Sequence, residues 1–554
     1  MFSFQDIGIE KYISAGETTG YQVSVGSGAM AVTPEPRATL VALDILRNGG
    51  TAVDAAIAAS SVLMVVTPHQ CSPGGDSYWL IKPFNEQIQA LNSSGRSPRS
   101  IDARQLEQYS GRIPARSAHA VTVPGVIEGW IETHHRFGTM SLRKLLNPAI
   151  NLARYGFPVS PYLARKLKAA DDLLAGREET SRIFRPNNRP IKVGEFLVQR
   201  DLADTLQRLA QDPKDFYRGQ IASEMAQYFD EIGGWLANTD FENHKSNWTK
   251  PINAKYGNWF IEEMPPNSQG IIALIGLMIY LDVANRLELD SDLVRTHAQI
   301  EAARIAMTVR NHEIGDMRAM RYQPGELVSP DFIEHLAGKV NLGKALSKKQ
   351  ILESLDYSKS TNISKHPRGD TVHCAIVDQK GMAVSMIQSI YFDFGTGIII
   401  PGTGIILQNR GHGFVLQKRH VNNFEVDKRP LHTLSPAMAL DNEHNLIAVF
   451  GAMGGDAQPQ LHMQMVDGLF DHALDPATVA YRPRWYVNPN DGLAVLVESR
   501  MKLAEKLEDL GHRIRKVSPF DDNMGHEQII MIDHRKKVKI GAADPRSDGI
   551  ALSF

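Results

Sequence analysis

The stretch Gly369-Asp370-Thr371-Val372-His373-Cys374-Ala375-Ile376-Val377-Asp378 decides how this chain is interpreted. It is almost entirely apolar from Val372 to Val377, which predicts a buried strand. The turn sequence Asp378-Gln379-Lys380-Gly381 follows, with glycine at a position that tolerates a positive φ. A second apolar run, from Met382 to Ile390, predicts the other strand of a hairpin. A threonine therefore opens this hairpin, directly after an aspartate.

The hydroxyl of Thr371 becomes a candidate nucleophile if the chain is cut between Asp370 and Thr371. A threonine hydroxyl is a poor nucleophile at neutral pH and needs a base. An N-terminal Thr371 supplies its own base, because an α-amino group has an unperturbed pKa of about 8. The alternative is an uncut chain in which Thr371 is simply a β-branched residue at the start of a core strand, which is a common arrangement.

The hairpin also places a second hydroxyl near the first. If Asp378 pairs with Gly381, then Thr371 faces Gln388, and Ser389 is the next residue along the strand. A turn of another length shifts this register by a residue, so the pattern predicts a neighbourhood and not a contact. We therefore expect Ser389 to lie close to Thr371.

A glycine pair further along the chain is a candidate oxyanion hole. The sequence Gly451-Ala452-Met453-Gly454-Gly455-Asp456 precedes a long predicted helix from Gln458 to His472. The backbone N–H groups at the start of a helix are unpaired and lie at the positive end of its dipole. Such groups can stabilise a developing negative charge. The alternative is a tight strand-to-helix turn with no chemical role.

The composition excludes several classes of function. The chain has 554 residues, of which 43% are hydrophobic and 22% charged, and its net charge is −2. These values are typical of a globular protein and argue against nucleic acid or membrane as the main partner. The two cysteines, Cys71 and Cys374, lie in apolar surroundings, so we expect them to be reduced.

The sequence also predicts neither a cofactor site nor a metal site. No Cys/His ligand spacing is present, and Gly74-Gly75 lacks the remaining residues of a phosphate-binding loop. The first residues do not form a signal-peptide pattern, and no apolar run approaches the length of a membrane span. We therefore expect a cytoplasmic protein.

A series of short motifs runs along nearly the whole chain. They are Asn48-Gly49-Gly50-Thr51-Ala52-Val53-Asp54-Ala55-Ala56, Pro73-Gly74-Gly75-Asp76, Val123-Pro124-Gly125, Pro265-Pro266-Asn267-Ser268-Gln269-Gly270, Asp370-Thr371-Val372-His373, Phe394-Gly395-Thr396-Gly397, Pro401-Gly402-Thr403-Gly404 and Gly454-Gly455. These motifs, in this order, resemble those of the γ-glutamyltransferase family of N-terminal-nucleophile hydrolases.

The resemblance implies an α+β fold, the four-layer αββα sandwich of the N-terminal-nucleophile hydrolases. Residues 1–370 would form the large chain and residues 371–554 the small chain, and the two associate in one composite domain. Thr371 would attack the carbonyl of Asp370, cut the precursor and later carry the acyl group of the substrate. By family position, Ser389 orients the Thr371 amino group, and the N–H groups of Gly454 and Gly455 form the oxyanion hole. A homodimer of the processed unit is left open.

The chain departs from true γ-glutamyl enzymes in residues that bind the substrate. Its arginine in Ser94-Gly95-Arg96-Ser97-Pro98 is displaced by two positions, and Gly413 replaces the aspartate that binds the glutamate α-amino group. The variant pattern is similar to the oxamate amidohydrolase-like branch, which implies a small amide that bears a carboxylate. The substrate-binding candidates are Arg96, Tyr391, Arg410, His432 and Thr433.

Two other functions remain open at this point. One is a γ-glutamyl hydrolase or transferase that acts on glutathione or related amides and binds glutamate through different residues. The other is a non-catalytic homologue that keeps the fold as a binding protein. The intact set of Thr371, Ser389, Gly454 and Gly455 argues against the non-catalytic alternative, because a binding protein has no need of a complete catalytic set.

Overall fold

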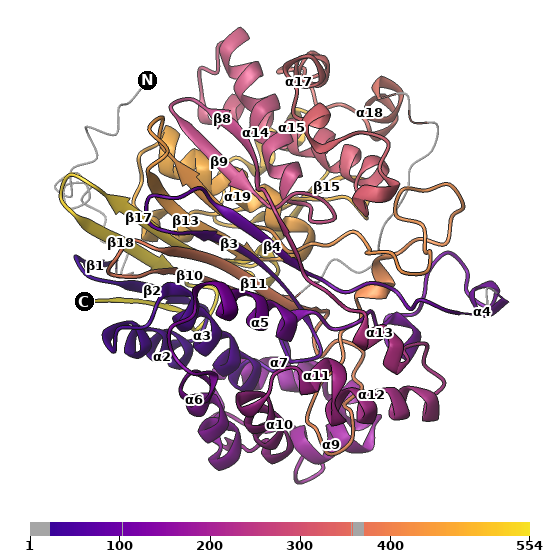
Figure 1. The fold of residues 1–554 in the computed structure, drawn as a ribbon. Coiled ribbons are helices and arrows are strands. Elements are labelled where there is room, and N and C mark those ends of the chain that lie inside the picture. The colour runs from indigo at the N-terminus through magenta and orange to yellow at the C-terminus, as the bar shows by residue number, and fades with distance from the viewer. Residues whose placement is uncertain (1–22, 102–103, 356, 358–369) are drawn as a thin grey trace.

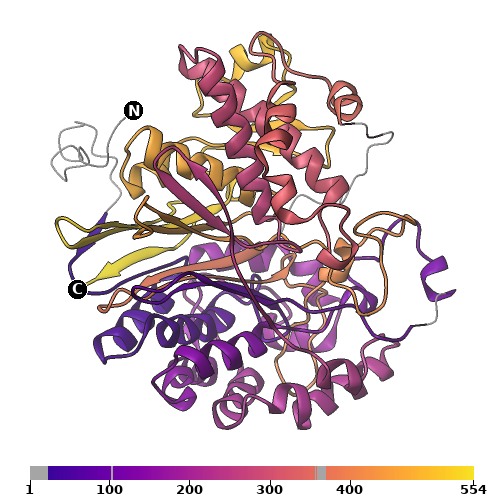
Figure 2. The same ribbon diagram turned by 45° about the horizontal axis from the view of Figure 1, so that its top comes forward.

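This computed structural model describes residues 23–101, 104–355, 357 and 370–554. In these residues two seven-stranded sheets stack face to face, and helices pack on their outer faces (Figure 1 and Figure 2). The predicted α+β class is confirmed. One sheet has the order β19 (Ile550–Ser553), β2 (Met30–Thr33), β10 (Asp370–Val377), β11 (Ala383–Tyr391), β3 (Asp76–Lys82), β4 (Gln89–Ser93) and β7 (Asn247–Thr249). The other has the order β1 (Ser24–Gly26), β18 (Val538–Ala543), β17 (His526–Asp533), β13 (Leu446–Met453), β12 (Pro436–Leu440), β9 (Trp259–Glu263) and β8 (Ile252–Tyr256).

The helices fall into two groups, one for each sheet. The group on the β10 sheet comprises α2 (Pro36–Arg47), α3 (Ala52–Val66), α5 (Val126–Phe137), α6 (Leu142–Tyr155), α7 (Pro161–Ala169), α8 (Asp171–Ala175), α9 (Glu178–Phe184), α10 (Arg200–Gln211), α11 (Asp215–Arg218) and α12 (Gln220–Glu231). The group on the β13 sheet comprises α14 (Gly270–Arg286), α15 (Asp292–Glu313), α16 (Pro324–Leu327), α17 (Pro330–Ala337), α18 (Lys348–Ser354), α19 (Gln458–Val466), α20 (Pro476–Tyr481) and α21 (Ala504–Asp509).

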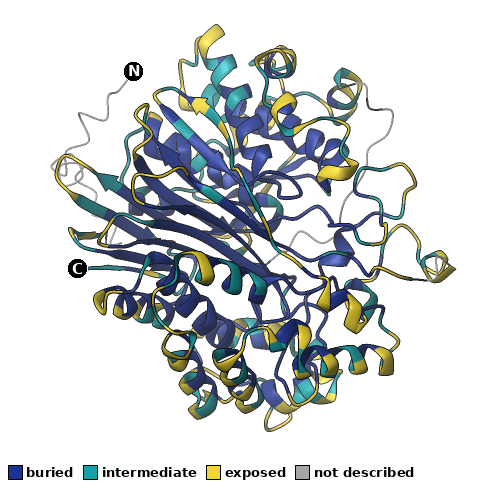
Figure 3. Cartoon of the chain, viewed as in Figure 1, coloured by how far each residue is buried: buried dark blue, intermediate teal, exposed yellow. Residues whose placement is uncertain are grey.

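The strand β10 is buried on both of its faces, which explains its nearly continuous apolar sequence. Successive side chains of a strand point to opposite faces of the sheet. Val372, Cys374 and Ile376 therefore pack in the core under the helices, whereas Ala375 and Val377 pack in the core between the two sheets. The colouring by burial shows both sheets in the buried class along most of their length (Figure 3).

The sequences of α2 and α3 explain how each helix packs. The α2 helix buries one face, which includes Ala38, Ala42 and Ile45, and every residue of α3 is buried, because its sequence is almost entirely apolar. The start of α3 is fixed by a capping box, in which the Thr51 side chain and the Asp54 side chain each bind the other residue's backbone N–H.

The hairpin of β10 and β11 forms, but the predicted register is wrong by one residue. The N–H of Asp378 donates to the carbonyl of Met382, so the turn is one residue longer than expected. The Asp378 carboxylate stabilises this longer turn, because its Oδ1 accepts from the N–H groups of Lys380 and Met382. As a result Gln388 pairs with Val372 and not with Thr371.

The segment after the glycine pair differs in part from the predicted helix. A short 3₁₀ turn, η5 (Gly455–Ala457), precedes α19, and the chain continues from Asp467 to Asp471 as a π-helix. Cys71 and Cys374 are both buried, and no disulfide joins them. Burial raises the pKa of the Cys71 thiol to about 12, so this thiol is not reactive at neutral pH.

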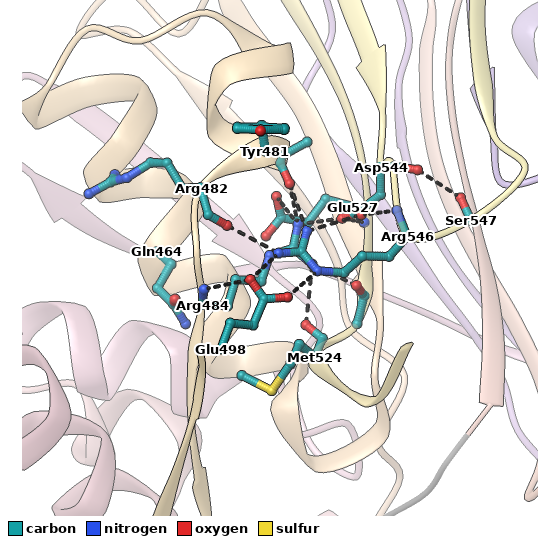
Figure 4. A network of polar contacts seen from close by, with 12 residues as sticks. Gln464, Tyr481, Arg482, Arg484, Glu498, Met524, Glu527, Asp544, Arg546 and Ser547 are labelled. Carbon is teal, nitrogen blue, oxygen red and sulfur yellow. Dashed lines mark hydrogen bonds and ion pairs between the residues drawn. The ribbon is translucent and has the colours of Figure 1, made fainter. Parts of the chain in front are cut away.

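A buried cluster of charges joins a small three-stranded sheet to β17 and β18 (Figure 4). The guanidinium of Arg546 donates to Glu498 at 2.7 Å and to Asp544 at 3.2 Å. Arg484 forms ion pairs with Asp544 and with Glu527. Since these side chains are nearly inaccessible to water, removing one arginine leaves the buried carboxylates with too little positive charge to compensate them. The strands of the small sheet are β14 (Trp485–Asn488), β15 (Ala494–Glu498) and β16 (Ile514–Val517).

Candidate active site

Thr371 lies at an irregularity between β10 and β11. The pairing runs from Asp370 opposite Tyr391 to Val372 opposite Gln388, so the register shifts at Thr371. Thr371 is 1% exposed, and its hydroxyl has no hydrogen-bond partner among the described residues. The predicted nucleophile is therefore a buried hydroxyl that no described side chain or backbone group engages.

Ser389 contacts the peptide bond that precedes Thr371. Its Oγ donates a hydrogen bond to the carbonyl oxygen of Asp370 at 2.5 Å and accepts one from the N–H of Tyr391 at 2.7 Å. The N–H of Tyr391 thus holds the Ser389 hydroxyl in the orientation that polarises the Asp370 carbonyl. Sequence reasoning placed Ser389 near Thr371, and the structure adds this contact to the bond between Asp370 and Thr371.

The glycine pair follows the end of β13. Both glycines have positive φ angles, 145° for Gly454 and 54° for Gly455, which side-chain-bearing residues adopt with difficulty. The Gly455 carbonyl accepts a hydrogen bond from Gln269 Nε2 at 2.7 Å. Because a peptide unit is planar, this contact also fixes the N–H group of Asp456, the residue directly after the glycine pair.

Gln269, which sequence reasoning did not select, connects the glycine loop to the residues around Thr433. Its Nε2 also donates to the carbonyl of Thr433 at 3.0 Å, and its Oε1 accepts from Arg310 Nη1 at 2.8 Å. Arg310 is fully buried and forms an ion pair with Asp456, the residue after the glycine pair. Gln269 lies in one of the family motifs quoted above, but no local pattern in the sequence indicates its contact with Arg310.

Arg410 is the basic candidate that the structure places beside the hairpin. Its guanidinium carbon lies 3.7 Å from the centroid of the Tyr391 ring, and Tyr391 is the strand partner of Asp370. Its Nη1 donates to the Thr433 hydroxyl at 3.2 Å, so Arg410, Tyr391 and Thr433 form one contact group.

The Arg410 guanidinium is buried with unused donors. It is 1% exposed, and its Nε and Nη2 atoms have no hydrogen-bond partner in the described part of the chain. Burial lowers its pKa, against the opposing effect of Tyr391 and Asp76. A buried charge with unsatisfied N–H groups is unfavourable unless an anion binds it. Arg410 is therefore suited to hold a carboxylate in this site.

His432 and Arg96 are held by other parts of the protein. The Nε2 of His432 lies 3.0 Å from Asp76 Oδ2, and its Nδ1 accepts from the N–H of Leu434, so both ring nitrogens are engaged. Arg96 forms an ion pair with Asp316 at 3.2 Å and lines a separate cavity of about 200 Å³. We therefore do not carry these two candidates forward as substrate ligands.

The described residues contain no group of three or more His, Cys, Asp or Glu side chains arranged to hold a metal ion. Within the same residues no helix is long and apolar enough to cross a membrane.

Comparison with known proteins identifies this chain as an enzyme that acts on amide bonds, in a group that includes hydrolases and acyltransferases. The chain belongs to the gamma-glutamyltranspeptidase family, whose family profile matches residues 38–554.

Relatives and solved structures support this assignment. The chain is 33% identical to the glutathione hydrolase-like YwrD proenzyme of Bacillus subtilis, over 96% of this chain and 99% of the relative. It is 32% identical to the oxamate amidohydrolase proenzyme of Klebsiella pneumoniae, with the same coverage. The crystal structure of cephalosporin acylase from Bacillus halodurans has a TM-score of 0.87 and 32% identity, and covers 100% of this chain and 99% of that chain.

Proposed function

We propose that this chain is a precursor that cuts itself between Asp370 and Thr371, and that the new N-terminal threonine then hydrolyses the amide bond of a small carboxylate-bearing substrate. The observation that carries the proposal is the hydrogen bond from Ser389 Oγ to the Asp370 carbonyl, together with a Thr371 hydroxyl that has no hydrogen-bond partner in the described part of the chain. The relatives described as proenzymes support it. We assign the fold to the four-layer αββα sandwich of the N-terminal-nucleophile hydrolases.

Self-cleavage proceeds by an N-to-O acyl shift. Thr371 Oγ1 bonds to the carbonyl carbon of Asp370, the peptide C–N bond breaks, and the hydroxyl proton ends on the freed amino group. Water then hydrolyses the resulting ester and separates a large chain, residues 1–370, from a small chain, residues 371–554. Ser389 assists the first step, because it donates to the oxygen on which negative charge develops. The two chains stay associated, since β10 lies between β2 and β11 in one sheet.

Turnover uses the same threonine with its own amino group as base. The amino group takes the hydroxyl proton, Thr371 is acylated, and an amine or ammonia leaves. Ser389 now orients the Thr371 amino group. The N–H groups of Gly454 and Gly455 stabilise the oxyanion of each tetrahedral intermediate. Water completes the cycle by hydrolysing the acyl-enzyme.

Arg410 selects a substrate with a carboxylate. Its free Nε and Nη2 donors match the two oxygens of a carboxylate in a bidentate pair. Tyr391 supplies the face on which the guanidinium stacks, and Thr433 holds Nη1. The oxamate amidohydrolase relative supports an oxamate-like acid as the substrate. A γ-glutamyl amide is the second candidate, supported by the glutathione hydrolase-like relative.

Two measurements test the proposal. The denatured mass of the purified protein should resolve into species of about 41 kDa and about 20 kDa, by residue fraction of the 61.4 kDa chain, with Thr371 at the start of the smaller one. A T371A variant should remain a single chain. A panel of oxamate, other small half-amides and γ-glutamyl-p-nitroanilide should then show turnover of the small acids. A wild-type chain that stays intact after long incubation would overturn the proposal.

A further inference from the structure

A lysine from the helical layer contacts the aspartate that precedes Thr371. Lys166, on α7, places its Nζ 3.1 Å from Asp370 Oδ2. The same Nζ lies 2.8 Å from Asp522 Oδ2 and 3.6 Å from Asp393 Oδ2. Its side chain is only 14% exposed, and the Tyr162 ring covers it with a centroid 5.5 Å away. The Lys166 ammonium is therefore in contact with three carboxylates, one of which belongs to Asp370.

The charges in this cluster explain why the lysine stays ionised. Burial lowers the pKa of Lys166, but the surrounding groups, Asp370 foremost, outweigh burial and raise it. His526 Nε2 lies 2.8 Å from Asp522 and occupies the other oxygen of that carboxylate. Without the ammonium, three carboxylates would face one another in a partly buried space, and their repulsion would push the Asp370 side chain away.

The position of the Asp370 side chain bears directly on its carbonyl. Asp370 is the first residue of β10, and the segment that precedes it, residues 358–369, lies outside the described residues. Among the described residues, Asp370 pairs with Tyr391 through its backbone and with Lys166 through its carboxylate. Its carbonyl accepts the hydrogen bond from Ser389 Oγ, so the ion pair with Lys166 restrains the same residue that carries the reacting carbonyl.

We propose that Lys166 is a positioning residue for self-cleavage, which holds Asp370 so that the Ser389 hydroxyl and the Thr371 hydroxyl both reach the bond between Asp370 and Thr371. This inference rests on the proposed self-cleavage. Lys166 makes and breaks no bond in the step; it acts through the Asp370 carboxylate. After cleavage it keeps Asp522 and Asp393 as partners, so release of Asp370 leaves no unpaired buried cation.

The test measures the rate of self-cleavage in the full chain. K166M keeps the length of the side chain and removes its charge, and we expect cleavage to slow by about tenfold to a hundredfold, because a small misplacement of the reacting groups has effects of that size. K166R keeps the charge and should recover much of the rate. K168M, an exposed lysine on the same helix, is the matched control and should cleave at the wild-type rate.

A second variant, D370N, tests the same ion pair without changing Lys166, so the inference does not depend on the folding of K166M alone. D370N leaves Lys166 paired with Asp522 and Asp393 but removes the charge that Lys166 contacts. It should slow cleavage as well, and the double variant K166M/D370N should be no slower than the slower single variant. Independent, multiplicative effects of the two changes would overturn the inference.

The outcomes separate this inference from the proposed function. If the wild-type chain does not cut itself, the proposed function fails, and the role of Lys166 fails with it. If the wild-type chain cuts itself and K166M or D370N cuts itself equally fast, only the inference about Lys166 fails. If K166M is slow and K166R is fast at equal thermal stability, the inference stands.

Discussion

Replacing Ser389 by alanine tests the central geometry of the site. The change removes one hydroxyl, which donates to the Asp370 carbonyl at 2.5 Å and accepts from the N–H of Tyr391 at 2.7 Å. The carbonyl loses the donor that faces its developing negative charge, and loss of one such donor slows acyl transfer by about 10²–10³-fold. We therefore expect S389A to cut itself about a hundred to a thousand times more slowly than the wild-type chain.

The same change also costs stability, and this effect must be separated from the effect on rate. A buried N–H and a buried carbonyl lose their partner, which costs about 1–3 kcal/mol for each unsatisfied group. S385A is the matched control on the same strand, because Ser385 Oγ contacts His373, the Phe450 carbonyl and the N–H of Ala437. Those contacts face the other sheet, so S385A should lose stability and still cut itself at the wild-type rate.

The assay follows the intact chain from the moment of purification. Samples are denatured at intervals, the two fragments are quantified by mass, and thermal unfolding is recorded for each variant. The T371A variant lacks the proposed nucleophile, so it gives the background rate of chain cleavage. If S389A cuts itself as fast as the wild-type chain, while T371A does not cut itself at all, the hydrogen bond to Asp370 has no part in cleavage and the assignment of Ser389 is refuted.

Three further predictions concern binding, pH and stability. R410M should lower kcat/KM on a carboxylate-bearing amide by about a hundredfold, a loss of about 3 kcal/mol for a charge-assisted hydrogen bond, and should leave a neutral amide of equal size unaffected; equal losses on both would contradict the role of Arg410. Burial raises the pKa of Glu262 to about 7 from an ordinary value of 4.5, so the folded state binds a proton at Glu262 more tightly than the unfolded state does. The stability that this proton contributes is lost as the pH rises from about 4.5 to 7. The free energy of unfolding of E262Q, measured by chemical denaturation, should therefore rise relative to that of the wild-type chain by up to about 3 kcal/mol between pH 5 and pH 8. If the difference between the two chains is the same at both pH values, the raised pKa of Glu262 is refuted. R546M should lower the free energy of unfolding by about 3–5 kcal/mol, because it leaves Glu498 and Asp544 without their shared partner, whereas R513M, at an exposed ion pair with Asp491, should cost under about 1 kcal/mol.

The local parts of the fold could be predicted because short-range rules govern them. The α2 helix ends at Asn48-Gly49, and α3 is apolar on every side, so both follow from propensity and periodicity. The hairpin was placed correctly, yet its register was missed by one residue. The Asp378 side chain selects the longer turn by accepting two backbone N–H groups, and the sequence alone does not distinguish this turn from the shorter one.

The parts of the site that come from distant segments could not be predicted. Arg410 and Arg96 look equivalent in the sequence, since each is a lone arginine among small or polar residues. Only the fold pairs Arg96 with Asp316 and leaves two nitrogens of Arg410 without a partner among the residues that the structure describes. His432 was a candidate because of its position, but Asp76, far away in the sequence, lies against its Nε2. Lys166 carries no local pattern that separates it from the surface lysine Lys168.

In the proposed function, one strand pair serves both self-cleavage and turnover, and this explains why its residues have more than one role. Before cleavage, Ser389 faces the carbonyl of Asp370, and the pairing of Asp370 with Tyr391 holds that carbonyl in place. In the proposed mature enzyme, the Thr371 amino group takes the place of the Asp370 carbonyl beside Ser389, so a single hydroxyl would first polarise a carbonyl and then orient a base. Tyr391 likewise pairs with Asp370 through its backbone and supports Arg410 through its ring. A substitution at Ser389 should therefore affect maturation and turnover together, whereas one at Arg410 should affect turnover alone.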